Sequence, residues 1–572
     1  MGFTFDTIRA ELRDAGDGLF RETAWIEESW KHPEDFAAAL MEYHSQLDPE
    51  PFKSKPRDGY DFYHDLVLRH VGTERVALMW LENGTVRKLT YAQLHAQCTQ
   101  RRAEWTAREV QKGQPLCVLA NMGPELIVPL LTGLRMGLVV TLLPPVGVDF
   151  LARRFRLLGN PWVATASRYV PLLRSLNLTR APLIERTDSS SVEPTSADAT
   201  SHTYPPDAVA LNVFSPVQDP PDEPVEVKAG PLYHAVLRDG LLLLGLNPGH
   251  LVAEAEQMHL QMQPTLLLTT MLRGAVLLHL NSGDFERDVR RDDPLVSLPP
   301  IHVLFANANL RTTMLNAPVR PIFGSLQLWV TNPQEIPNPS AWSDWTARWG
   351  LQSVPAISLM YDSACGGGLM FSLRHFGTPS GYLMPVPGRP FELLQPDDSG
   401  QPARTNYGLF KPSPKSITLL LTHIEGGYLY AGTRTPTNEG QATSKEEIEQ
   451  AVQDLSFVRG ASLVQEPGDR GPSTLMLFTG PETIGWAKNY MRRRQLLAEQ
   501  AIRQKLSPGH VPARILICSA VPRLTSGGRI DHHWCAQMLQ SGEIFRRNGN
   551  PIFLLLDRLL LTMLPAIDRK LK

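Results

Sequence analysis

The fold is decided by the stretch Pro115-Leu116-Cys117-Val118-Leu119-Ala120, a short apolar run that ends at Asn121. Such a run is typical of a strand that is buried in a parallel sheet. The next residues predict a helix from Pro124 to Met136, which Gly137 would stop, and a second strand from Leu138 to Leu143. Strand, helix and strand with short connections predict an α/β fold built on doubly wound sheets.

The same alternation continues on the C-terminal side of this unit. A helix is predicted over residues 264–274, and it leads directly into a strand over 275–280. Another strand, over 354–361, runs into the glycine-rich turn Cys365-Gly366-Gly367-Gly368. The carboxyl end of such a strand is where α/β proteins commonly place their functional groups, so this turn becomes a candidate site.

A domain boundary is predicted at residues 433–443, a polar and turn-rich stretch that precedes a charged helix. We therefore expect a large N-terminal domain over residues 1–432 and a small α+β C-terminal domain over 433–540. Residues 541–572 would form a C-terminal extension.

The extension contains a strongly apolar run over residues 552–567. Asp557 and Arg558 interrupt this run and Pro565 would break a helix, so it is too short for the roughly 20 residues of a membrane span. It predicts an amphipathic helix that packs on its own protein, with attachment to a membrane surface as the alternative.

The composition is that of a soluble globular chain with enough apolar material for a core. Of the 572 residues 42% are hydrophobic, and 56 basic side chains face 58 acidic ones, which gives a net charge of -2. This balance gives no reason to expect a nucleic-acid partner. The five cysteines form no CxxC pair and the first residues carry no secretory signal. We expect a cytoplasmic protein with free thiols and no metal site.

Several motifs together resemble the acyl- and aryl-CoA ligases of the adenylate-forming superfamily. The resemblance runs from about residue 70 to 540 in the family's order, and its glycine- and tyrosine-rich segment is most similar to the benzoate and anthranilate CoA-ligase branch. The matching segments are Lys88–Leu94, Asn121–Glu125, Gly133–Gly137, Gly426–Arg434, Glu446–Glu449, His510–Arg514 and Val521–Asp531. The resemblance implies an acyl pocket, a pantetheine tunnel and a CoA thioester as substrate.

The sequence departs from this family where the family binds ATP. The loop that would hold the phosphates spans residues 214–224 and includes Ser215, Pro216 and Asp219. Its four prolines lack amide donors and its three carboxylates would repel a triphosphate. The family's catalytic lysine is replaced by Arg529, and the chain before Gly426 is too short for the usual ribose-binding turn. We expect that ATP and magnesium are not used and that no cofactor is tightly bound.

A further departure lies in the turn Tyr361-Asp362-Ser363-Ala364-Cys365, where the family carries a magnesium-binding glutamate in place of Cys365. A thiol beside the acyl carbonyl could act as a nucleophile, since even an unperturbed cysteine is partly thiolate at neutral pH. The alternative is a small residue that fills the space of the absent metal. The resemblance implies that Tyr361, Ser363, Ala364 and Gly366 line the acyl site.

Candidate general bases are His234 and His259, although a single histidine is often purely structural. The resemblance places His259 along the acyl pocket and tunnel, and Met262 against an aromatic acyl ring.

These expectations lead to an acyltransferase that moves an aromatic acyl group, such as anthraniloyl, from CoA to the phosphopantetheine of an acyl carrier protein without ATP. The Cys365 thioester would be the intermediate. The pattern is similar to that of the anthraniloyl-CoA:carrier-protein transferases that prime aurachin-type polyketide pathways. Two alternatives stay open: a noncatalytic scaffold that binds a carrier protein or a partner ligase, and an aryl-CoA ligase with a rebuilt ATP site.

Overall fold

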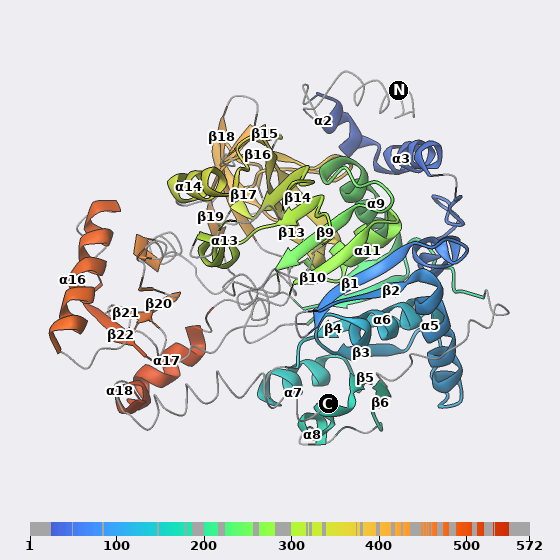
Figure 1. Cartoon of the computed structure of the whole chain (residues 1–572), viewed down its shortest axis with the longest axis horizontal. Helices are drawn as coiled ribbons and strands as arrows, with labels where there is room; N and C mark the ends of the chain where they lie inside the picture. The colour runs from blue at the N-terminus through green and yellow to red at the C-terminus, as the bar shows by residue number, and fades with distance from the viewer. Residues whose placement is uncertain are drawn as a thin grey trace. The chain divides into compact units, whose positions relative to one another are not determined.

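The computed structural model divides the chain into two compact units, Met1–Ala431 and Gly432–Lys572, which are described separately (Figure 1). The structure describes residues 24–48, 50–82, 85–145, 148–174, 176, 178, 180–185, 200–214, 223–255, 262–280, 299–315, 319, 323–333, 339–372, 374–377, 381–395, 401–412, 418–424, 427–434, 448–449, 451–452, 455, 457–458, 460–465, 473–479, 488–505, 512–519, 530 and 532–547.

The strand–helix–strand unit predicted from the sequence is present. Strands β3 (Pro115–Leu119) and β4 (Val139–Leu143) pair in parallel, and helix α6 (Pro124–Met136) connects them. Gly137 ends the helix in the left-handed conformation, at φ 75°. A Cβ on Gly133 would lie 2.7 Å from Leu116 Cδ2 and 2.9 Å from Val140 Cγ2, so a glycine is needed where α6 meets the sheet.

This unit belongs to a six-stranded sheet in the order β6-β5-β3-β4-β7-β8. All pairs are parallel except the edge pair of β7 and β8. Helices α5 and α6 lie beside this sheet (Figure 1). The remaining elements of this layer are α5 (Tyr91–Thr106), α7 (Val148–Leu157), β5 (Trp162–Ala166), η2 (Ser167–Tyr169), α8 (Val170–Arg174), β6 (Leu183–Glu185), β7 (Val209–Val213) and β8 (Val225–Lys228).

A thirteen-stranded sheet forms the second layer of the first unit. Its central strands run parallel in the order β13-β12-β11-β9-β10-β1, and antiparallel strands extend it on both sides. The strands are β1 (Val76–Glu82), β2 (Thr85–Thr90), β9 (Leu251–Ala255), β10 (Val276–Leu280), β11 (Val303–Phe305), β12 (Leu328–Thr331), β13 (Pro355–Asp362), β14 (Gly367–Phe371), β15 (His375–Phe376), β16 (Tyr382–Pro385), β17 (Tyr407–Phe410), β18 (Thr418–Ile424) and β19 (Gly427–Arg434).

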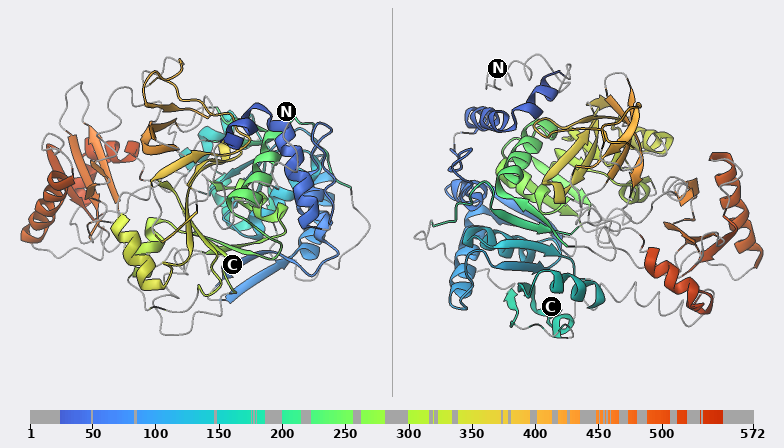
Figure 2. Two further views of the ribbon diagram at one scale, coloured as in Figure 1. Left: turned by 90° about the horizontal axis from the view of Figure 1, so that it is seen from above. Right: turned by 180° about the vertical axis from the view of Figure 1, so that it is seen from behind.

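Apolar helices cover both faces of this sheet. On one face Leu277 and Val252 join a core with helices α9 and α11, and on the other Leu278 and Trp329 join a core with α13 and α14 (Figures 1 and 2). The helices of the first unit outside the six-stranded layer are α2 (Ala24–Lys31), α3 (Pro33–Leu47), α4 (Phe62–Leu66), η1 (Leu68–His70), α9 (Ala229–Arg238), η3 (Asp239–Leu243), α11 (Thr265–Leu272), α13 (Ala308–Leu315), α14 (Pro339–Trp349) and η6 (Ser363–Cys365).

The second unit is a three-stranded sheet between helices. Strands β20 (Gly460–Gln465) and β21 (Ser473–Phe478) are antiparallel, and β22 (Arg514–Cys518) pairs in parallel with β21. One face packs against helix α16 and the other against α17 and α18. These helices are α16 (Lys488–Lys505), α17 (His532–Gln540) and α18 (Glu543–Arg547). The expected fold class, a large α/β unit with a smaller α+β unit, is therefore confirmed.

Parts of the sequence-based predictions lie outside the described residues. They include residues 435–443 of the predicted boundary stretch and the apolar run at 552–567. Within the described part of the chain, no helix is long and apolar enough to cross a membrane. All five cysteines are described, and each is a buried thiol.

Candidate active site at the end of strand β13

The turn that carries Cys365 follows the last central parallel strand. Strand β13 ends at Asp362, whose carboxylate accepts a hydrogen bond of 2.9 Å from the Ala364 amide. One turn of 3₁₀ helix, η6, brings the chain to Gly366, which adopts φ 81°. Strand β14 then returns antiparallel to β13. The sequence predicted a glycine-rich turn through residue 368, but the turn ends at Gly366.

Gly367 and Gly368 belong to β14, where they pair with Asp362 and Tyr361 of β13, and Asp239 occupies the space beside them. The Gly368 amide donates a 2.7 Å hydrogen bond to Asp239 Oδ2. A Cβ on Gly367 would collide with the same carboxylate oxygen, and φ there is 146°. These glycines therefore allow a buried carboxylate to approach the backbone closely, which the sequence pattern alone did not indicate.

Asp239 is part of a buried ion pair beneath the turn. Its Oδ1 lies 2.6 Å from Arg238 Nη2, and both side chains are almost completely buried. Arg238 also donates hydrogen bonds to the carbonyls of Gly368 at 3.0 Å and Pro387 at 3.3 Å. The charges of this pair are thus satisfied by each other and by backbone groups, as buried charges require.

Cys365 is 6% exposed and lies between polar and apolar neighbours. Its thiol donates to Asp362 Oδ2 at 3.9 Å, and its carbonyl accepts a hydrogen bond from Arg389. The apolar side belongs to the core formed by β13, β14 and β16–β18, including Met370 and Leu419. The thiol therefore lies at the boundary between this core and a charged group of side chains.

Arg389 provides the positive charge of that group. Burial lowers the pKa of the Arg389 guanidinium, whereas the Cys365 thiol and the carboxylates of Asp239 and Asp362 act in the opposite direction. A cation such as Arg389 beside the Cys365 thiol favours the thiolate. The carboxylate of Asp362, three residues before Cys365, can accept the thiol proton. The turn can therefore support thiol chemistry.

The same donor set does not suit magnesium, which takes hard oxygen ligands in octahedral geometry. At this turn the groups are a thiol, a guanidinium and the carboxylates of Asp362 and of Asp239, and Asp239 is already paired with Arg238. Within the described part of the chain, no cluster of three or more His, Cys, Asp or Glu side chains could hold a metal ion.

Several predicted substrate-binding residues meet at helix α11. Ser363 Oγ lies 2.8 Å from Thr265 Oγ1, and Thr265 also donates a hydrogen bond to the Met262 carbonyl at 2.9 Å. The Tyr361 hydroxyl lies 3.4 Å from Thr269 Oγ1. Burial, followed by the negative charge of Asp239, raises the pKa of Tyr361, so its hydroxyl stays protonated. The structure thus brings Met262, Tyr361 and Ser363 to the start of α11.

Ala364 and Gly366 are the other two predicted residues of the turn. Ala364 is 4% exposed. A Cβ on Gly366 would lie 3.6 Å from Leu232 Cα and 3.8 Å from Ala235 Cβ, so this glycine rests on helix α9. The turn is held between α9 and α11.

His234 also lies on α9 but points elsewhere. Its Nε2 lies 2.6 Å from the Tyr60 hydroxyl. At 100° per residue, His234 is turned by about 100° from Ala235 and about 160° from Leu232, the two residues of α9 that lie against Gly366. Burial, followed by the charge of Arg238, lowers the pKa of His234 to about 4. The described contacts do not bring His234 to Cys365.

The other predicted residues lie outside the described part of the chain. These are His259, the loop residues Ser215, Pro216 and Asp219, and Arg529.

A buried polar pair near the carboxyl ends of the parallel strands was not identified from the sequence. Glu254 of β9 and His279 of β10 are in register on neighbouring strands, with exposures of 0% and 5%. Glu254 Oε2 accepts a 2.8 Å hydrogen bond from Gln263, just before α11. The sequence does contain a signal for this pair. Glu254 and His279 are each the one polar side chain of an otherwise apolar strand, and each lies next to the carboxyl end of its strand.

Comparisons with known proteins rest on structure. No protein-family model matches this sequence, and no curated protein matches it. Acetoacetyl-CoA synthetase from Streptomyces lividans superimposes with a TM-score of 0.67 at 16% identity, covering 96% of both chains.

Two aryl-CoA ligases are also similar. The anthranilate CoA ligase AuaEII, solved in complex with anthranoyl-AMP, gives a TM-score of 0.63 at 14% identity, covering 85% of this chain and 97% of that one. A benzoate CoA ligase from Burkholderia xenovorans LB400 gives 0.62 at 15% identity, covering 83% and 100%. The chain therefore has the fold of the adenylate-forming acyl- and aryl-CoA ligases.

Proposed function

We propose that this chain transfers an aromatic acyl group from CoA to the phosphopantetheine thiol of an acyl carrier protein, without ATP, through an acyl thioester on Cys365. The observation that carries the proposal is a thiol at the carboxyl end of β13, with Asp362 as hydrogen-bond acceptor and Arg389 bound to the same turn. Active sites of open α/β sheets lie outside the carboxyl ends of the strands, so the position is suited to chemistry.

The first half-reaction exchanges one thioester for another. Asp362 takes the proton from the Cys365 thiol as the sulfur attacks the acyl carbonyl of the CoA thioester. The bond between the carbonyl carbon and the CoA sulfur breaks, and the CoA thiolate receives the proton from Asp362. One thioester is broken and one is formed, so the exchange is nearly isoenergetic and needs no nucleotide.

The second half-reaction repeats these steps with the carrier protein. The pantetheine thiol of the carrier gives its proton to Asp362 and attacks the Cys365 thioester. Cys365 leaves as a thiolate and recovers the proton. The product is the acyl carrier thioester, and the enzyme returns to its starting state, which predicts ping-pong kinetics. Arg389 would stabilise the Cys365 thiolate in both half-reactions, because its positive charge interacts with Cys365.

In this proposal the acyl group binds beside the Cys365 turn and the start of α11. Met262 and Tyr361 are buried there, and a thioether and an aromatic ring suit an aromatic acyl group. Glu254 and Gln263 contribute polar groups near the same helix. An amino-substituted aromatic acid such as anthranilate has a hydrogen-bond donor that a buried carboxylate could accept.

The test is transfer of radiolabelled anthraniloyl from CoA to phosphopantetheinylated carrier protein in the absence of ATP. Wild type should transfer the label, and Cys365→Ala should abolish transfer. Cys117→Ala, which removes a buried thiol from the other sheet, is the matched control and should retain it. Transfer that survives Cys365→Ala would overturn the covalent route and leave direct attack by the carrier thiol.

Two other functions have specific support. The burial of Cys365 against Met370 and Leu419 favours a noncatalytic scaffold, which would transfer no label in any variant and still bind the carrier. The anthranoyl-AMP bound to the structurally similar anthranilate CoA ligase favours a ligase with a rebuilt nucleotide site. Exchange of pyrophosphate into ATP that depends on free anthranilate would identify that ligase.

A further inference from the structure

Arg389 lies on a loop that contacts two helices near the start of the chain. Residues 386–391 follow strand β16, outside any helix or strand, and we call them the arginine loop. The Arg389 guanidinium donates to the Cys365 carbonyl, and its charge interacts with the Cys365 thiol. The position of the arginine loop therefore sets the distance between this charge and the sulfur.

Helix α2 is hydrogen-bonded to two backbone groups of the arginine loop. The Gly388 amide donates a 2.7 Å hydrogen bond to Ser29 Oγ. The Trp30 indole donates a 3.1 Å hydrogen bond to the Val386 carbonyl. Ser29 is completely buried, and its hydroxyl donates in turn to a carbonyl of α2 itself, so its direction is fixed. One of these two bonds holds the residue immediately before Arg389.

Side chains of α2 and α3 also pack against the arginine loop. The ring centroids of Trp30 and Phe391 lie 5.8 Å apart. Phe391 packs in turn against the apolar core that contains Cys365. A Cβ on Gly388 would lie only 2.5 Å from Phe36 Cδ1 of α3, so the loop backbone lies directly against that ring. The loop is thus in contact with both helices and with the core of Cys365.

The arginine loop has one further support, from helix α9. Arg238 donates a 3.3 Å hydrogen bond to the Pro387 carbonyl while it pairs with Asp239. The Arg389 charge interacts with both members of this pair and with Asp362. Asp362 ends β13 and Arg238 ends α9, whereas Arg389 lies outside regular secondary structure. The position of Arg389 therefore depends on the contacts that its loop makes.

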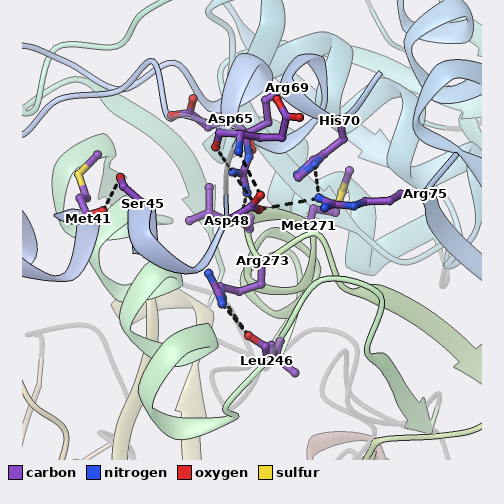
Figure 3. Close-up of polar contacts among 12 residues, drawn as sticks. Met41, Ser45, Asp48, Asp65, Arg69, His70, Arg75, Leu246, Met271 and Arg273 are labelled. Atoms are coloured by element: carbon purple, nitrogen blue, oxygen red, sulfur yellow. Dashed lines mark hydrogen bonds and ion pairs between the residues drawn. The ribbon is translucent and has the colours of Figure 1, made fainter. Parts of the chain in front are cut away.

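The far end of α3 is fixed to the central part of the first unit. Asp48, the residue that follows α3, lies 3.3 Å from Arg69 Nη1, as Figure 3 shows. Both of these side chains are almost completely buried. Arg69 also donates a 2.6 Å hydrogen bond to the Leu272 carbonyl, at the end of α11. Helix α3 is therefore anchored at one end, and the arginine loop lies against its other end.

We infer that Ser29 and Trp30 are positioning residues for the Cys365 thiol, because they hold the arginine loop where Arg389 lies beside Cys365. This inference rests on the proposed function, in which the sulfur of Cys365 attacks the acyl group. Ser29 and Trp30 act through Arg389 rather than on the sulfur itself. They keep a positive charge beside the thiol, and this charge favours the thiolate.

Alkylation of Cys365 by iodoacetamide tests this inference on the full chain without CoA or a carrier protein. The reaction is followed as a function of pH and located by peptide mass spectrometry, and its rate follows the thiolate fraction. Arg389→Met removes the cation and should lower the rate near neutral pH about tenfold or more. Ser29→Ala and Trp30→Phe displace the cation, so each should lower the rate about three- to fivefold and move the pH profile upward.

Two comparisons separate positioning from a general loss of structure. Ser45→Ala is the matched control, because the Ser45 hydroxyl donates at 2.9 Å to the Met41 carbonyl within α3 (Figure 3). This variant should react like the wild type. Ser29→Ala should cause no further loss when it is added to Arg389→Met, because its effect passes through Arg389.

The wild-type rate and pH profile in both Ser29→Ala and Trp30→Phe would overturn the inference. A loss from Ser29→Ala that persists beside Arg389→Met would also overturn it. If iodoacetamide does not reach Cys365, the ultraviolet absorbance of the thiolate decides by the same criteria, as the difference between each variant and its Cys365→Ala counterpart. Absence of acyl transfer together with the expected alkylation pattern would refute the proposed function and leave this inference standing.

Discussion

The ion pair of Arg238 and Asp239 provides a sharp test of how the Cys365 turn is supported. Asp239→Ala removes one partner of a pair whose side chains are 4% and 0% exposed. Arg238 would then be a buried charge without its counterion, which costs about 3 to 5 kcal/mol. The Gly368 amide would also lose its 2.7 Å acceptor. Because both losses share the same site, we expect a total of about 3 to 5 kcal/mol rather than their sum.

Asp239→Asn separates the charge from the hydrogen bond. The amide oxygen can still accept from Gly368, so we expect a smaller loss of about 2 kcal/mol. Asp207→Ala is the control, because Asp207 is 92% exposed and its 3.3 Å ion pair with Lys228 should contribute less than about 1 kcal/mol.

Urea unfolding followed by tryptophan fluorescence gives the free energies of these variants. The order of stability should be wild type, Asp207→Ala, Asp239→Asn and then Asp239→Ala. If Asp239→Ala unfolds within about 1 kcal/mol of wild type, the Arg238–Asp239 pair does not support the turn, and our account of Gly367 and Gly368 is incorrect.

Two further predictions concern the large unit. The pKa of His234 is about 4 in the folded protein, against an ordinary value of 6.5. Below pH 6.5 the unfolded chain binds a proton at this residue more tightly than the folded chain does. The stability that neutral His234 contributes above pH 6.5 is therefore lost as the pH falls towards 4. NMR of labelled histidine should show its ring titrating below pH 5, and titration near 6.5 would contradict the burial. Gly133→Ala should destabilise the protein by about 1 to 3 kcal/mol, since the new Cβ would lie 2.7 Å from Leu116 and 2.9 Å from Val140. A neutral effect in chemical denaturation would mean that α6 can move away from the sheet.

Features specified by neighbouring residues could be predicted from the sequence. The helix over 124–136 has its predicted bounds, because Pro124 and Gly137 mark both ends locally. The start of helix α5 is likewise marked locally, because the Thr90 hydroxyl accepts from the Gln93 amide and the Gln93 side chain accepts from the Thr90 amide. Such signals lie within four residues of the structure that they determine.

Features that depend on distant residues could not be predicted. Asp239 is 129 residues from Gly368, and its carboxylate accepts from a strand amide where the glycines predicted a turn. The same holds for Arg69 and the Leu272 carbonyl, 203 residues apart. His234 was a reasonable candidate base, because a histidine can take up a proton near neutral pH. Tertiary packing determines which face of α9 meets β14, so the sequence could not show that His234 contacts Tyr60 instead of Cys365. The local pattern identified Cys365 but not Asp362 as its hydrogen-bond acceptor, and Arg389 comes from the connection that follows β16.

The central claim is that Cys365 carries the acyl group. Intact-protein mass spectrometry after mixing with anthraniloyl-CoA, without ATP and without carrier protein, tests it most directly. We predict one anthraniloyl adduct per chain, located on the peptide that contains Cys365, present in Cys117→Ala, absent in Cys365→Ala and removed when carrier protein is added. An unmodified wild-type mass under conditions in which the carrier becomes acylated would contradict the claim.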